Sequence, residues 1–225
     1  MSKLTNEILA SVRRAVALQL WELGAVRVNV KKPFKLASGN YSPIYINCRR
    51  LISSPAFVDL FTAATRIVCE TSKVEFGVIA GGETAGIPFA AFAGRAFGKP
   101  MIYVRKEVKS HGIASRIEGS LTPGARVLLV EDLITDAGSK LGFIEAIRQA
   151  GATVKDVIVV FDRLQGGQRA LRKDGVTLHA LTDMNMALSV GKESGTLPKE
   201  VENIVNSYLR NPREWHKSVG LPFIG

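Results

Sequence analysis

The most informative stretch of the chain is residues 127–139, Val127-Leu128-Leu129-Val130-Glu131-Asp132-Leu133-Ile134-Thr135-Asp136-Ala137-Gly138-Ser139. The four apolar residues at the start predict a strand that is buried on both faces, as strands of parallel sheets are. Two adjacent carboxylates come next, followed by a short polar loop. Apolar residues at nearly helical spacing then predict a helix that Gly151 ends. This order places functional groups at the carboxyl end of a strand, where open α/β sheets bind ligands.

An ordinary turn between a strand and a helix can also carry two solvated acids, so the order of elements leaves both interpretations open. Two features favour a sugar-phosphate site. The carboxylates can accept hydrogen bonds from the ribose hydroxyls, and the amides of residues 135–139 converge near a helix N-terminus, which suits a phosphate. On these residues the stretch resembles the phosphoribosyl diphosphate (PRPP) motif of type I phosphoribosyltransferases. In that family two acids follow a hydrophobic strand, and a Thr/Gly-rich loop follows the acids.

Length and composition indicate a globular protein of one well-cored domain with an appendage, because the chain has 225 residues, 46% of them hydrophobic. No stretch approaches the length of a membrane-spanning helix, and the first residues lack the apolar core of a signal peptide. Cys48 and Cys69 have neither metal nor redox spacing. These observations predict a cytoplasmic protein without a membrane partner.

The formal net charge of +10 predicts an anionic partner. Nucleic acid is one such partner, but the basic residues do not form a dense tract with interleaved aromatic residues. They lie in short groups at 31–32, 49–50 and 105–116. This distribution favours a small, highly charged substrate over nucleic acid, although it does not explain the whole excess of positive charge.

A second informative segment, called the hood below, is residues 34–47, Phe-Lys-Leu-Ala-Ser-Gly-Asn-Tyr-Ser-Pro-Ile-Tyr-Ile-Asn. Its pattern predicts two short extended runs joined by a turn at 38–40, with Pro43 at an edge. A surface hairpin without function would show the same pattern. The residues themselves resemble the block near the N-terminus that covers the base in orotate phosphoribosyltransferases. Purine phosphoribosyltransferases lack this block.

Two further loops follow predicted strands. The glycine pair Gly81-Gly82, after a strand at 76–80, lets the backbone approach a ligand closely; a tight structural turn is the alternative. The same family places its diphosphate-binding loop here. Residues 105–116 have no helical or strand period and are strongly basic, which is also typical of a solvated loop. Arg105, Lys106, Lys109 and His111 match the family's catalytic loop at every characteristic position, and such a loop can close over a diphosphate.

The resemblance implies a type I phosphoribosyltransferase fold. We expect an α/β protein whose five-stranded, mainly parallel sheet is flanked by helices, with strands at 76–80, 101–104, 127–130, 156–161 and 176–181. The chain should form one domain, 1–225. Its parts would be an N-terminal helix and hood (1–50), a parallel core (51–181) and a helical tail (182–225). Trp215 and His216 of the tail suggest no chemistry, and we expect the tail only to pack.

The implied reaction is Mg²⁺-dependent transfer of phosphoribosyl from PRPP to orotate, giving orotidine 5′-monophosphate and diphosphate. The catalytic residues would be Lys109, His111 and Asp132. PRPP would contact Glu83, Thr84, Ala85, Arg105, Lys106, Lys109, His111, Glu131, Asp132, Leu133, Ile134, Thr135, Asp136, Ala137, Gly138 and Ser139. Orotate would contact Tyr45, Ile46, Thr135 and Arg163. Mg²⁺ would be held mainly by PRPP and water, near Asp132. The family is usually dimeric, with loop 105–116 completing the partner's site.

Three alternatives remain open at this point. A phosphoribosyltransferase for a purine or for uracil would share residues 131–139, but the hood and the basic loop argue against it. A PRPP-sensing regulator that binds nucleic acid would explain the charge, yet no helix-turn-helix segment is evident. A catalytically silent relative is the third, because Ala37, Ala85 and Asp136 depart from the family's usual residues. Arg163 also has an alternative role, as the ion-pair partner of Asp162.

Overall fold

The computed structural model describes residues 3–36, 38–107 and 115–224. Its helices are α1 (Lys3–Glu22), α2 (Pro55–Ser72), α3 (Gly86–Phe97), α4 (Gly138–Gln149), α5 (Gly167–Lys173), α6 (Met184–Glu193), α7 (Lys199–Arg210) and α8 (Pro212–Ser218), with a 3₁₀ helix at Cys48–Ser53. The strands are β1 (Val26–Val28), β2 (Phe34–Lys35), β3 (Tyr41–Ser42), β4 (Ile44–Ile46), β5 (Val78–Gly82), β6 (Met101–Val104), β7 (Ile117–Glu118), β8 (Arg126–Ile134), β9 (Thr153–Asp162) and β10 (Thr177–Asp183).

The central sheet has the strand order β10-β9-β8-β5-β6-β7. The first five of these strands are parallel, which confirms the predicted α/β fold with a mainly parallel sheet. The predicted number of strands was wrong by one, because β7 pairs antiparallel with the edge strand β6. Two residues that continue a basic loop carry too little hydrophobic pattern to indicate a strand.

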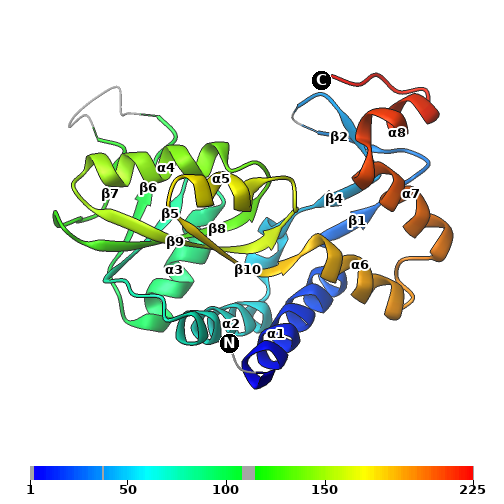
Figure 1. The fold of residues 1–225 in the computed structure, drawn as a ribbon. Coiled ribbons are helices and arrows are strands. Elements are labelled where there is room, and N and C mark those ends of the chain that lie inside the picture. Colours follow the sequence, from blue (N-terminus) through cyan, green and yellow to red (C-terminus); the bar gives the residue numbers. More distant parts are fainter. Residues whose placement is uncertain (1–2, 37, 108–114, 225) are drawn as a thin grey trace.

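Strand β8 shows why its sequence had to be apolar. Leu128 and Val130 pack into a core with α1, α2 and α3 on one face of the sheet. Val127 and Leu129 pack into a second core with α4 on the opposite face. Figure 1 shows α4 and α5 on one side of the sheet and α1, α2 and α3 on the other. A strand covered on both faces needs apolar residues at consecutive positions rather than at alternate ones.

The strand also extends further than the sequence predicted. The expected strand ended at Val130, whereas β8 continues to Ile134 and pairs Glu131 with Val159 of β9. The two acids therefore lie within the strand, near its carboxyl end, and not in the loop after it. Because successive side chains of a strand point to opposite faces, Glu131 and Asp132 are directed apart.

The hood and the tail lie together beyond the carboxyl edge of the sheet. Strands β2 and β3 form the predicted hairpin, and β4 pairs antiparallel with β1. Helices α7 and α8 stand next to β1, β2 and β4 in Figure 1. Gly191 lies inside α6, although glycine is a poor helix former. A Cβ atom there would come within 2.6 Å of the Trp21 ring, so this glycine serves the close contact of α1 with α6.

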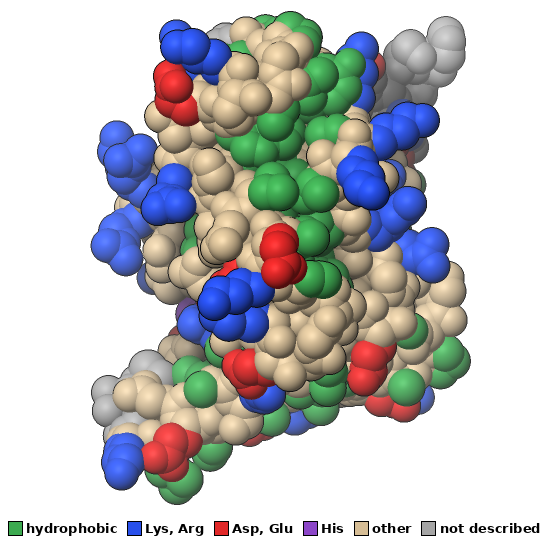
Figure 2. All heavy atoms as spheres, turned by 90° about the vertical axis from the view of Figure 1, so that its right-hand side faces the viewer, with side chains coloured by type: hydrophobic (Ala, Val, Ile, Leu, Met, Phe, Trp, Pro, Cys, Tyr) green, Lys and Arg blue, Asp and Glu red, His purple; other side chains and the backbone are tan. Residues whose placement is uncertain are grey.

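No helix in the described ranges is long and apolar enough to cross a membrane. On the face shown in Figure 2, the Lys and Arg side chains form separate groups among other residues. On that face the positive charge is therefore dispersed, as the short basic groups in the sequence indicated.

Candidate active site

A cavity of about 600 Å³ opens at the carboxyl edge of the sheet, where the sequence predicted a ligand site. Three parts of the chain line it. The core supplies Ala85, Asp132, Leu133, Thr135, Arg163 and Gln165; the hood and the residues after it supply Leu36, Ser38, Asn40, Tyr45, Ile46, Asn47 and Arg49; and the tail supplies Tyr208, Pro212, His216 and Phe223. Seven of the predicted site residues thus meet in one cavity: Tyr45, Ile46, Ala85, Asp132, Leu133, Thr135 and Arg163.

Asp132 presents its carboxylate to this cavity from β8. Burial raises the pKa of Asp132, while the charge of Lys140 and hydrogen bonds to backbone amides, among them that of Leu133, lower it again. A carboxylate that is partly withdrawn from water and faces a cavity is well placed to accept hydrogen bonds from a bound hydroxyl pair.

Glu131 lies beneath the cavity rather than in its wall, with only 3% of its surface exposed. One carboxylate oxygen accepts a hydrogen bond from the backbone N–H of Gly82 at 2.7 Å. The other forms an ion pair with the Lys140 ammonium at 3.0 Å. Burial raises the pKa of Glu131 to about 7, against the opposing effect of Lys140. Both oxygens therefore contact protein, and the predicted contact of Glu131 with ribose stays a prediction.

The loop after β5 is packed onto this buried acid. A Cβ atom at Gly82 would lie 2.5 Å from Glu131 Oε1, and one at Gly86 would lie 2.0 Å from it. Only glycine fits such approaches, so the glycines of this loop serve contact with Glu131 as well as access for a ligand. Of the predicted diphosphate contacts, Glu83 and Thr84 fall between these glycines, and Ala85 borders the cavity.

The predicted catalytic loop starts beside the same turn. The backbone N–H of Lys106 donates to Glu83 Oε2 at 2.9 Å, and Arg105 N–H donates to the carbonyl of Arg116 at 2.8 Å. The Arg105 guanidinium also forms an ion pair with Glu118, with 3.6 Å between Nη1 and Oε1. Lys109 and His111 lie outside the described residues, so their predicted catalytic roles stay predictions. Both ends of the loop nevertheless lie near the turn predicted to bind diphosphate.

The predicted phosphate loop joins β8 to α4. Ala137 has a φ of 77°, in the left-handed region, and ends the strand sharply before α4 begins at Gly138. Asp136 is exposed, and its Oδ1 accepts the Gly138 N–H at 3.0 Å. The N–H of Gly138, one of the amides that were expected to hold a 5′-phosphate, is therefore already bonded to the Asp136 carboxylate. Ile134 is buried, and Ser139 is exposed at the start of the helix.

Arg163 follows β9 and faces the cavity opposite the hood. The alternative ion pair with Asp162 is not formed, since Asp162 Oδ1 instead accepts the Leu164 N–H at 2.8 Å. Arg163 Nε is buried and has no hydrogen-bond partner among the described residues. The backbone N–H of Arg163 donates to the Ile134 carbonyl at 3.0 Å, which fixes the start of this segment next to β8.

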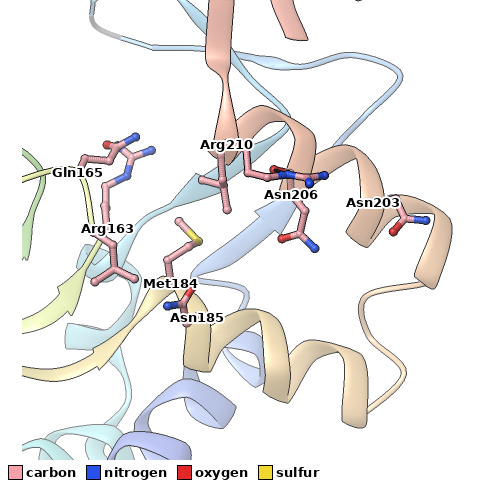
Figure 3. Close-up of a pocket in the computed structure, with 9 residues that line it drawn as sticks. Arg163, Gln165, Met184, Asn185, Asn203, Asn206 and Arg210 are labelled. Atoms are coloured by element: carbon pink, nitrogen blue, oxygen red, sulfur yellow. Dashed lines mark hydrogen bonds between the residues drawn. The ribbon is translucent and has the colours of Figure 1, made fainter. Parts of the chain in front are cut away.

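A second cavity of about 510 Å³ adjoins Arg163 on the side of the tail. Figure 3 shows Arg163 and Gln165 on one side of it, Met184 and Asn185 at the start of α6, and Asn203, Asn206 and Arg210 on α7. Arg163 and Gln165 line both cavities, so this short segment forms the partition between them.

The sequence indicated neither Arg49 nor the tail as part of the site. Arg49 Nε donates to Asn47 Oδ1 at 3.2 Å, and both residues border the cavity. The one feature of the sequence that could have indicated Arg49 is its position in a short basic group directly after the hood. Nothing in the tail sequence indicated a site, because its lining residues Tyr208, Pro212, His216 and Phe223 are spread over two helices and an extension.

The chain is similar in sequence and in fold to several known proteins. No family model matches the chain. An orotate phosphoribosyltransferase of Sinorhizobium medicae is 44% identical over 217 residues, which cover 94% of this chain and 93% of that protein. The structure of UMP synthase from Leishmania donovani superposes with a TM-score of 0.75 at 30% identity, covering 87% of this chain. The chain spans 42% of the length of that synthase.

An orotate phosphoribosyltransferase structure from Aeropyrum pernix superposes with a TM-score of 0.69 at 31% identity, covering 80% of this chain and 98% of that one. The Sinorhizobium medicae protein is matched over nearly its whole length, and the Aeropyrum pernix structure shares the fold. The hood, the acidic strand end and the basic loop had pointed to the same proteins. The chain belongs to the orotate phosphoribosyltransferase family.

Proposed function

We propose that this protein transfers the phosphoribosyl group of PRPP to orotate, releasing diphosphate and forming orotidine 5′-monophosphate. The observation that carries the proposal is the single cavity in which Asp132 and Thr135 of the β8 end face Tyr45 of the hood and Arg163. Such a cavity can hold a sugar phosphate against the sheet edge and a planar base under the hood.

The chemistry requires stabilisation of separated charge rather than a covalent nucleophile. As the bond from ribose C1 to the diphosphate oxygen breaks, positive charge develops on the ribose and negative charge on the diphosphate. Asp132 would hold the ribose hydroxyls. The amides of the loop after β5, together with Arg105, Lys106, Lys109 and His111, would neutralise the diphosphate. A ring nitrogen of ionised orotate then forms the new bond to C1.

Besides its predicted contact with ribose, Glu131 would act through the protein. Its contacts with Gly82 and Lys140 hold the diphosphate loop against the end of β8. This places the ribose acid Asp132 and the loop amides in a fixed relation before substrate arrives, which lowers the cost of ordering them during the reaction.

The site fits a Mg²⁺ that is held mainly by substrate. Asp132 offers carboxylate oxygens to the cavity, and within the described residues no group of three His, Cys, Asp or Glu side chains could hold a metal ion. Mg²⁺ prefers oxygen ligands and retains several waters. When bound, it would supply positive charge to the diphosphate oxygens.

The direct test is a turnover assay with PRPP, Mg²⁺ and a panel of bases. We expect orotate to be consumed only in the presence of both PRPP and Mg²⁺, with an equal amount of diphosphate released. Excess chelator should stop the reaction, and restored Mg²⁺ should restart it. Equal or faster use of uracil, adenine or hypoxanthine would reject the assignment to orotate.

Replacing Arg163 with alanine should impair the use of orotate more than the use of PRPP, because its guanidinium faces the proposed base position. Loss of a charge-assisted hydrogen bond costs about 1.5–3 kcal/mol, roughly a tenfold to hundredfold fall in kcat/KM for orotate. Steady-state kinetics with each substrate varied in turn would measure it. Arg169, an exposed residue on α5, gives the control Arg169→Ala. An unchanged constant for orotate would remove Arg163 from the base site.

The dimer with shared sites and the cytoplasmic location stay predictions. Lys109 of one subunit would complete the site that contains Asp132 of the other. The backbone N–H of Lys106, at the start of the loop, donates to Glu83 next to the predicted diphosphate turn.

A further inference from the structure

The C-terminal tail is joined to the tip of the hood by hydrogen bonds. His216 on α8 is buried, with 1% of its surface exposed. Its Nδ1 lies 2.6 Å from the Pro212 carbonyl, to which it donates, and its Nε2 accepts the backbone N–H of Tyr41 at 3.0 Å. Because Tyr41 N–H can only donate, the imidazole here is the neutral form with its proton on Nδ1.

A second contact joins Asn40, the residue before Tyr41 in the hood, to Ile224 at the end of the tail. The Asn40 side chain donates to the Ile224 carbonyl at 2.9 Å and accepts the Ile224 N–H at 2.7 Å. Gly39 is closely covered as well, since a Cβ atom there would lie 2.6 Å from Ile224 Cδ1. These two contacts, Tyr41–His216 and Asn40–Ile224, are called the hood–tail contact below.

Aromatic packing makes the tail side of this contact rigid. The His216 ring packs against Phe223 with centroids 5.1 Å apart and against Trp215 at 5.0 Å. Trp215 in turn packs edge-on against Tyr208 of α7 at 5.1 Å. Tyr208, His216 and Phe223 also line the active-site cavity, together with Leu36, Ser38 and Asn40 of the hood. The tail, which was expected only to pack against the rest of the protein, therefore forms one wall of the cavity.

We propose that the tail sets the position of the hood over the base, and that His216 is the positioning residue that fixes it. The inference rests on the proposed use of orotate under the hood. The hairpin β2–β3 has only two residues in each strand, so it has few bonds of its own to hold its shape. The hood–tail contact supplies the missing bonds at its tip. The tail then determines how tightly a planar base is enclosed, without contacting PRPP at the sheet edge.

The test compares two substitutions of His216. His216→Phe keeps a ring for packing but removes the acceptor, and it leaves the partly buried Tyr41 N–H without its partner. His216→Gln keeps an acceptor at a similar distance from the backbone. A donor that loses its partner in a partly buried position is costly, so we expect His216→Phe to raise KM for orotate about tenfold and to leave KM for PRPP within about twofold. His216→Gln should recover most of the loss, and Lys217→Ala, on the exposed side of α8, is the control.

A readout besides activity separates positioning from simple loss of stability. In His216→Phe, amide hydrogen exchange at Tyr41 should accelerate about tenfold, while amides of β8 and β9 keep the protection of the unchanged protein. Asn40→Ala should act in the same direction with a smaller effect, about threefold on KM for orotate, because this contact is more exposed.

Several outcomes would overturn the inference. These are an equal rise of both KM values, a His216→Gln variant as impaired as His216→Phe, or unchanged exchange at Tyr41. Failure of the proposed function is distinguishable from these, because then the unchanged protein itself would not consume orotate with PRPP and Mg²⁺.

Discussion

Mixing Asp132→Ala subunits with Lys109→Ala subunits is expected to restore about a quarter of the wild-type activity, although each variant alone is nearly inactive. Asp132 faces the cavity and would hold the ribose, while Lys109 would neutralise the diphosphate of the partner's site. Random exchange makes about half of the dimers hybrid, and each hybrid has one site with both lesions and one site with neither. Half of the sites in half of the dimers are then intact. The measurement is orotate consumption before and after exchange.

The matched control reverses the arrangement. A chain that carries both substitutions is mixed with wild-type chains in equal amount. If the sites are shared, every hybrid site has one lesion, and activity should fall to about half of its value before exchange. If the loop acts within its own subunit, activity stays constant in the control and the first mixture recovers nothing. Differently tagged chains must confirm exchange, because without exchange neither result is informative.

Lys140→Met is expected to be the most destabilising single change at the site, because it leaves Glu131 buried without its counter-charge. Removing one partner of a buried ion pair costs about 3–5 kcal/mol. Glu131 and Lys140 are 3% and 9% exposed, so water cannot replace the lost contact. We expect this loss in the free energy of unfolding measured with denaturant at pH 8. Glu131→Gln combined with Lys140→Met should recover most of it, since a neutral amide still accepts the Gly82 N–H.

The same pair predicts how stability depends on pH. The folded-state pKa of Glu131, about 7, lies above the ordinary value of 4.5, so between these values the folded state binds more protons than the unfolded state. The contribution of Glu131 to stability therefore falls as pH rises through this window. Without Lys140 the folded-state pKa rises further and the fall extends to higher pH. The Lys140→Met variant should thus lose less stability at pH 6 than at pH 8. A loss that is independent of pH would show that packing, and not charge, is responsible.

Local signals in the sequence predicted the fold well. Serine followed by proline is typical of a helix start, and α2 begins at Pro55 with the Ser54 hydroxyl accepting the Phe57 N–H at 3.2 Å. The hairpin at 34–42 and the five parallel strands follow equally from turn residues and apolar runs. Each of these depends on residues that are close in the sequence, which is where such patterns carry information.

Within the core of the chain, the predicted site residues that line the cavity are those at or after strand ends, while Tyr45 and Ile46 were predicted from the resemblance of the hood. Asp132 and Arg163 were predicted to share a site because the carboxyl ends of parallel strands meet at one edge, and both line the cavity. The separate directions of Glu131 and Asp132 depend on how far β8 extends, which an acidic pair after an apolar run does not reveal. His216 could not be found from the sequence, because its partner Tyr41 is 175 positions away and nothing local marks a tertiary contact.

That long separation has a consequence for the order in which the molecule assembles. The bonds of the hood–tail contact join residues 175 and 184 positions apart, whereas β8 and β9 pair across the single helix α4. Closing the longer chain segment costs more entropy, and contacts of this kind tend to form late. Loops and chain ends also open more readily than the strands of a core, and this contact joins a loop to the end of the chain. We therefore expect the hood–tail contact to form after the sheet has folded, and to open on warming while the strands are still intact.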